Sequence, residues 1–153
     1  MKKIVLIILV TIISSCGYHL RSSNKLAQNY PQLRLSLSSQ SLLKRPLINA
    51  LISSGVKLSE ETHVNALVIK KDSLHKVIQS IGANNQVQEY RIEYDIEYSI
   101  GESDVRNIHL EKDYSFDIQQ ISGGQQEEQN LRKQMAEDMA WTIIRQINAS
   151  IKN

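Results

Sequence analysis

The side chains most suited to chemistry are four carboxylates in one short segment, Glu89, Glu93, Asp95 and Glu97. Two neighbouring carboxyl groups can act as a general acid and a general base, as in glycoside hydrolysis. These four all occupy odd positions, and residues two apart on a strand lie along the same open face of a sheet. Since no activated nucleophile accompanies them, we interpret them as a hydrated or partner-facing surface and expect no enzyme activity.

The histidines do not suggest a site either. They are spread along the chain, and no phosphate-binding loop, dinucleotide fingerprint or metal-spaced Cys/His cluster accompanies them. His109 falls on the polar side of an alternating segment, which is typical of a hydrated histidine rather than a ligand or base. The four histidines are His19, His63, His75 and His109. We therefore predict no metal and no catalytic cofactor.

The first residues have the layout of a secretory signal. Lys2 and Lys3 precede an apolar run over residues 4–13, which is too short to span a bilayer, and Ser14-Ser15-Cys16 follows. This end resembles the bacterial lipobox, in which cleavage before the cysteine is coupled to its lipidation. An ordinary signal with an incidental cysteine is the alternative. The chain has one cysteine, which could form no internal disulfide, and lipidation would give it a purpose.

The predicted organisation is therefore a lipoprotein signal peptide over 1–15, a lipidated Cys16 with a tether over 16–30, and a single α+β domain over 31–153. Cys16 would carry a covalent diacylglycerol and an N-linked acyl chain. The next residue is Gly17 rather than Asp, which by the usual sorting pattern implies the outer membrane.

The charge balance restricts the possible partners. The chain has 18 basic and 16 acidic residues, and removal of the signal with Lys2 and Lys3 leaves it formally neutral. A neutral protein is a poor non-specific binder of nucleic acid, so we expect no nucleic-acid partner. The basic residues are concentrated in the first half, which leaves room for an anionic partner.

One alternating segment, 88–100, predicts the central strand of an antiparallel sheet. Its apolar face carries Tyr90, Ile92, Tyr94, Ile96, Tyr98 and Ile100. Strands are also predicted over 33–37, over 66–81 with a bulge near Lys70-Lys71-Asp72, and over about 107–118. The last of these places Ile108, Leu110, Tyr114, Phe116 and Ile118 on one face, with Lys112 as the exception.

Two helices complete the predicted fold. The first covers about 46–54, with Pro46 in its first turn and Gly55 as a left-handed cap. The second covers about 125–151, after a break at Ser122-Gly123-Gly124, and has an apolar residue at every fourth position from Leu131 to Ile151. The order of elements predicts an α+β two-layer sandwich, with a four-stranded, mainly antiparallel sheet and both helices on its Tyr/Ile face.

Two residues are candidates for partner binding. Trp141 lies nearly opposite the apolar stripe of the long helix at 100° per residue, and large exposed aromatic side chains are enriched at interfaces. Glu93 represents the polar face of the sheet, which could meet water or a hydrophilic partner.

Three patches of sequence resemble the LptE family of lipopolysaccharide-assembly lipoproteins. Cys16-Gly17-Tyr18-His19-Leu20-Arg21 is similar to the start of the mature family members, Gln88–Ile92 to their entry into the central strand, and Glu127–Arg145 to their last helix. The resemblance implies an outer-membrane lipoprotein that plugs and supports an LptD-type β-barrel and helps to place lipopolysaccharide in the outer leaflet.

The resemblance also implies direct binding of lipopolysaccharide, for which Arg91 is the candidate residue, flanked by Glu89 and Glu93. The chain departs from the expected pattern because 81–86 and 122–126 contain no basic residue. The alternative function is a periplasm-facing lipoprotein adaptor that binds peptidoglycan or another envelope protein.

Overall fold

The computed structural model describes residues 25–83, 85–115 and 121–151. Its elements follow in the order α2 (Lys25–Asn29), β1 (Gln32–Ser36), α3 (Lys44–Ser53), β2 (Lys57–Leu58), β3 (Ala66–Ile81), β4 (Val87–Ile100), β5 (Arg106–Ser115) and α4 (Ile121–Ser150). The predicted signal peptide over 1–15, Cys16, Phe116 and Ile118 lie outside the described residues, so the expectations for them stay predictions.

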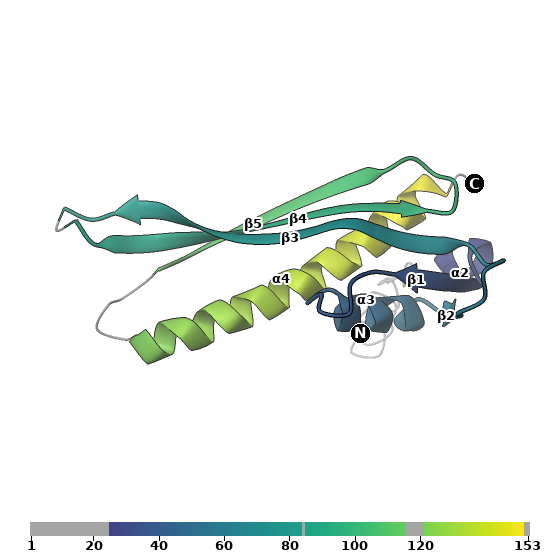
Figure 1. The fold of residues 1–153 in the computed structure, drawn as a ribbon, viewed down its shortest axis with the longest axis horizontal. Coiled ribbons are helices and arrows are strands. Elements are labelled where there is room, and N and C mark those ends of the chain that lie inside the picture. The colour runs from purple at the N-terminus through teal and green to yellow at the C-terminus, as the bar shows by residue number, and fades with distance from the viewer. Residues whose placement is uncertain (1–24, 84, 116–120, 152–153) are drawn as a thin grey trace, which may run out of the picture.

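The sheet has the strand order β2-β1-β3-β4-β5. Strand β1 runs parallel to β2 and β3, whereas β3, β4 and β5 form an antiparallel meander. Figure 1 shows α4 crossing below the meander, and α3 lying beside the short strands β1 and β2. The predicted α+β sandwich is confirmed, with five strands instead of four because the expected connection over 56–64 contains β2.

The two faces of β4 are as unequal as its alternation predicted. The inner face packs against α4, and Ile92, Tyr94, Ile96 and Tyr98 are at most 1% exposed. The stripe of α4 that meets it is buried to the same extent at Met135, Met139, Ile143 and Ile147. The core therefore lies between the inner face and α4, and the outer face of the meander carries the alternate, polar residues.

Strand β3 has the predicted bounds and the predicted bulge. Its pairing with β4 shifts register between Ile69 and Lys71, so one extra residue is inserted there. This insertion lets Leu67 and Ile69 share the inner face with Leu74 although the sequence phase changes between them. Leu67 is fully buried, and Ile69 and Leu74 are partly buried against the core.

Helix α3 begins two residues earlier than predicted, and Pro46 lies in its first turn. Its end is a Schellman motif, in which the Gly55 N–H donates to the Ile52 carbonyl and the Val56 N–H to the Leu51 carbonyl. Gly55 has a φ of +82°, which confirms the predicted left-handed cap. A Cβ there would lie 3.2 Å from the Cβ of Ala27, so α2 also approaches this position closely.

Two larger differences from the expectation concern α2 and α4. Residues 25–29, assigned to the tether, form α2, and its Leu26 is fully buried in the core. Helix α4 begins at Ile121, so the break expected at Ser122-Gly123-Gly124 was wrong. Glycine is permitted in a helix and only weakens it, which is why two adjacent glycines predict a break without enforcing one.

Candidate partner-facing surfaces

The outer face of β4 and β5 is a continuous row of charged and polar side chains. The register pairs Arg91 with Asp113, Glu93 with Glu111, Asp95 with His109 and Glu97 with Asn107. Five of these eight residues are acidic and only Arg91 is permanently basic. The outer face is therefore an acidic surface.

Arg91 lies within this acidic row and is held by carboxylates of β5. Its Nε is 2.6 Å from Asp113 Oδ1 and its Nη2 is 3.0 Å from Asp113 Oδ2, which is a bidentate pair. Its Nη1 also donates to Glu111 Oε2 at 3.2 Å. The hydrogen bond with Asp113 raises the pKa of Arg91 and lowers the pKa of Asp113. An anionic lipid group would have to compete with both carboxylates for Arg91.

Glu93 is half-buried on the same face, directly opposite Glu111. Like charges in this position repel each other, and the contact of Arg91 with Glu111 offsets part of the repulsion. His109 Nδ1 lies 2.8 Å from Asp95 Oδ1, and its Nε2 lies 3.8 Å from Glu111 Oε2. The hydrogen bond to Asp95 raises the pKa of His109, so the histidine adds positive charge to this face when the pH falls.

Trp141 lies on the side of α4 that faces away from the sheet and is 43% exposed, as predicted. It borders a groove of about 350 Å³ between α3 and α4. The other lining residues are Arg45, Pro46, Asn49, Ala50, Ser53, Glu137 and Asp138. An exposed tryptophan beside a groove of mixed charge is a suitable contact for a protein partner.

The structure does not bring the predicted site residues together. Arg91 and Glu93 lie on the outer sheet face, whereas Trp141 lies on the opposite side of the molecule, beyond α4. Cys16 is outside the described residues. The candidate site therefore consists of two separate surfaces.

A polar cluster between β3, β5 and α4 was missed from the sequence. Glu128 Oε2 accepts a hydrogen bond from Lys76 Nζ at 2.6 Å and from the Tyr114 hydroxyl at 2.6 Å. Its Oε1 is 2.7 Å from Arg132 Nη2. Burial would raise the pKa of Glu128, but the bonds from Lys76, Tyr114 and Arg132 outweigh burial and lower that pKa to about 2.

Aromatic rings close this cluster on the sheet side. Lys76 Nζ lies 3.9 Å from the centre of the Tyr90 ring, and Tyr90 stacks on Tyr114 with 5.8 Å between ring centres. Lys76 faces inward beside Ile92, as does Lys112, which the sequence had marked as an exception in its strand. Lys112 Nζ bonds Asp138 of α4 at 2.8 Å. Inward-facing lysines on these strands were the available signal that acidic residues of α4 would meet them.

The described part of the chain shows neither a metal-binding cluster nor a membrane-spanning helix. In residues 25–83, 85–115 and 121–151, no three His, Cys, Asp or Glu side chains are grouped so that they could hold a metal ion. None of the helices described there is both long enough and apolar enough to cross a membrane.

Solved structures with this fold include several lipoproteins. A minor lipoprotein from Acinetobacter baumannii has 22% sequence identity and a TM-score of 0.69, over 78% of this chain and 92% of that one. Rare lipoprotein B from Shewanella oneidensis has 25% identity and a TM-score of 0.68, over 78% and 95%. An uncharacterized lipoprotein B from Nitrosomonas europaea has 18% identity and a TM-score of 0.69, over 77% and 82%. The chain thus has the α+β fold that these three lipoproteins share.

The family follows from the sequence comparison. The model of the lipopolysaccharide-assembly family LptE matches residues 30–147. The chain belongs to the LptE family, as its sequence patches suggested. Among curated proteins, none has significant sequence similarity to the chain.

Proposed function

We propose that this protein is an outer-membrane lipoprotein that occupies the lumen of an LptD-type β-barrel and supports the assembly of lipopolysaccharide into the outer leaflet. The observation that carries the proposal is membership of the lipopolysaccharide-assembly family over residues 30–147. Cys16 would supply the lipid anchor, and the folded domain would supply the contacts with the barrel.

The two candidate surfaces are consistent with a protein enclosed by its partner. A barrel surrounds its contents, so a plug is contacted on opposite sides at once. Here the outer sheet face carries hydrophilic, largely acidic side chains, and the opposite side carries the exposed Trp141 beside the α3–α4 groove. A lipoprotein adaptor that binds one envelope component would use one of these surfaces and leave the other hydrated.

Photo-crosslinking from both surfaces distinguishes the two functions. A photoreactive amino acid at Trp141, and separately at Glu93, should trap the same large outer-membrane protein in living cells. A matched control at Glu61, an exposed residue on the β2–β3 connection, reports the background of chance crosslinks. Crosslinks from one surface alone, or to different proteins from the two surfaces, would contradict the plug function and favour the adaptor.

The pairs that Arg91 forms on β5 argue against direct lipid binding at this residue. The guanidinium is already paired with Asp113 and Glu111, and the face around it is acidic, so it repels anionic head groups. We therefore base the proposed function on the contacts with the barrel and not on a lipid site at Arg91.

A further inference from the structure

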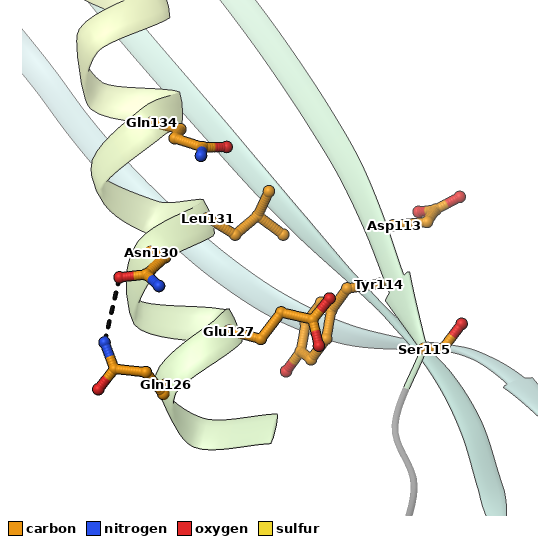
Figure 2. A pocket seen from close by; sticks show the side chains of 8 residues that line it. All are labelled: Asp113, Tyr114, Ser115, Gln126, Glu127, Asn130, Leu131 and Gln134. Carbon is orange, nitrogen blue, oxygen red and sulfur yellow. Dashed lines mark hydrogen bonds between the residues drawn. The ribbon is translucent and has the colours of Figure 1, made fainter. Parts of the chain in front are cut away.

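A second groove lies between the end of β5 and the first half of α4. It has a volume of about 680 Å³ and contains neither Trp141 nor Glu93. Figure 2 shows its lining side chains, which come from three consecutive residues of β5 and from one side of α4. They are Asp113, Tyr114, Ser115, Gln126, Glu127, Asn130, Leu131 and Gln134. We name this the β5–α4 groove.

The β5 side of the groove offers backbone hydrogen bonds. Strand β5 is the last strand of the sheet, so within the described residues β4 is its only strand neighbour. On such an edge every second residue directs its N–H and C=O away from the sheet. An extended chain is the ligand that can pair with this repeating pattern of donors and acceptors.

The α4 side offers an apolar contact and a carboxylate. Leu131 is partly buried and directed towards β5, and Glu127 is directed the same way in Figure 2. Glu127 forms no hydrogen bond or ion pair with any described residue, whereas Gln126 and Asn130 bond to each other at 3.1 Å. Glu127 is thus an acidic group available to a basic side chain.

The spacing of these two side chains matches a strand. Glu127 and Leu131 are four residues apart on α4, which is a rise of about 6 Å. Alternate residues of an extended chain lie on one face and are about 6.6 Å apart. An extended segment along β5 could therefore place a basic side chain at Glu127 and an aliphatic side chain at Leu131.

The charges of β5 argue against a second copy of this chain as the occupant. Glu111 and Asp113 both lie on the outer face of β5. Antiparallel pairing of two β5 edges at the groove would bring the acidic side chains of both copies onto one face, where they repel each other. A segment with basic residues has the complementary charge.

We propose that the β5–α4 groove binds an extended, basic polypeptide segment of a partner protein, which adds as a sixth strand to the edge of β5 that no described strand covers. The segment carries a basic and an aliphatic residue at alternate positions facing α4. This inference does not depend on the proposed barrel function: the groove shares Asp113 with the outer face but contains neither Glu93 nor Trp141, the residues on which that function is tested.

A synthetic peptide tests the proposal on the full-length chain in detergent. The probe is a fluorescent heptapeptide with alternating Lys and Val at its odd positions and Thr at its even positions. We expect saturable binding by fluorescence anisotropy, together with slower hydrogen exchange of the backbone amides of β5. The matched probe has N-methyl groups on alternate amides, which removes strand hydrogen bonds and keeps the side chains. Its affinity should be lower by about tenfold or more.

Two variants test the helix side. Glu127→Gln should weaken binding of the unmodified peptide by roughly three- to tenfold, since it removes the charge opposite Lys. Glu102→Gln, at an exposed residue of the turn between β4 and β5 and outside both grooves, should leave the affinity unchanged.

Three outcomes would overturn the proposal: no binding, equal binding of the N-methylated peptide, or protection of amides elsewhere than in β5. Concentration-dependent self-association that protects β5 without any peptide would also overturn it, in favour of a second copy as the occupant.

Discussion

At the scale of single residues, charged side chains lie on both faces of the sheet and have different partners. On the outer face Arg91 pairs with carboxylates of the neighbouring strand, in contact with water. On the inner face Lys76 and Lys112 pair with carboxylates of α4. Exposed pairs contribute little to stability, whereas shielded pairs are costly to break from one side. The Lys76–Glu128 pair, with side chains 30% and 19% exposed, is therefore the one whose loss should be measurable, whereas the Lys112–Asp138 pair is 37% and 56% exposed.

The most connected of these residues is Glu128, whose side chain is 19% exposed. Glu128→Gln removes the charge that balances Lys76 and Arg132 and should lower the free energy of unfolding by about 1–3 kcal/mol at neutral pH. Glu127→Gln on the adjacent, exposed position should change it by less than about 0.5 kcal/mol. Urea unfolding of both variants gives the comparison, and equal effects would contradict a special role for Glu128.

The same residue predicts a pH dependence. The pKa of Glu128 is about 2 in the folded chain and 4.5 ordinarily, so the unfolded state binds the proton more tightly. Its stabilisation is fully present above pH 4.5 and is lost as the pH falls towards 2. Glu128→Gln should lack this part of the acid destabilisation. The difference in the free energy of unfolding between wild type and variant should therefore shrink as the pH falls from 4.5 towards 2, and urea unfolding at several pH values measures it. A difference that stays constant over this range would contradict the prediction.

At the scale of elements, sequence periodicity predicted the long elements and failed for the short ones. Strands β3 and β4 and the bulge near Lys71 could be predicted because alternation over many residues has one structural solution. Strand β2 has only two residues, Lys57 and Leu58, and too short a pattern to show a period. Helix α2 offered a single large apolar residue, Leu26, whose burial depends on elements distant in sequence.

The candidate surfaces could be predicted from the sequence only in part. Trp141 could be placed on the exposed side of α4 because helical geometry fixes its angle to the stripe. The pairing of Arg91 with Asp113 could not be predicted, since it depends on the register of β4 against β5. The sequence suggested Glu89 and Glu93 as the acidic neighbours of Arg91. Both lie on the same strand as Arg91, and Glu89 accepts a hydrogen bond from the Ser80 hydroxyl of β3.

The packing of α4 on the sheet gives the prediction for this scale. Ile96 of β4 and Ile143 of α4 are 1% and 0% exposed, so Ile96→Ala and Ile143→Ala should each cost about 2–5 kcal/mol of stability. Glu97→Ala, next to Ile96 but on the outer face, should cost less than about 0.5 kcal/mol. Denaturant unfolding in which Glu97→Ala is the most damaging of the three would mean that the buried and exposed faces of β4 were assigned the wrong way round.

At the scale of the whole molecule, α4 is tied to the sheet by polar contacts along its length. Glu128 bonds Lys76 near one end, Asp138 bonds Lys112 in the middle, and Gln146 accepts from Tyr98 near the other end. Between these contacts the apolar stripe fills the core. These contacts join the outer sheet face and the Trp141 side of α4 into one folded unit.

The proposed location of the whole molecule in the outer membrane rests on the predicted lipidation of Cys16. Two or three acyl chains would hold the protein in a membrane almost irreversibly, because each buried methylene contributes about 0.8 kcal/mol. Cys16→Ala should therefore abolish labelling by a lipid precursor and yield an unprocessed or unanchored form, as membrane fractionation and metabolic labelling would show. Ser15→Ala keeps a small residue before the cysteine and should be processed and labelled as the wild type. If Cys16→Ala were still labelled and fractionated normally with the outer membrane, the predicted anchor at Cys16 would be wrong, and an ordinary cleaved signal would fit residues 1–15 better.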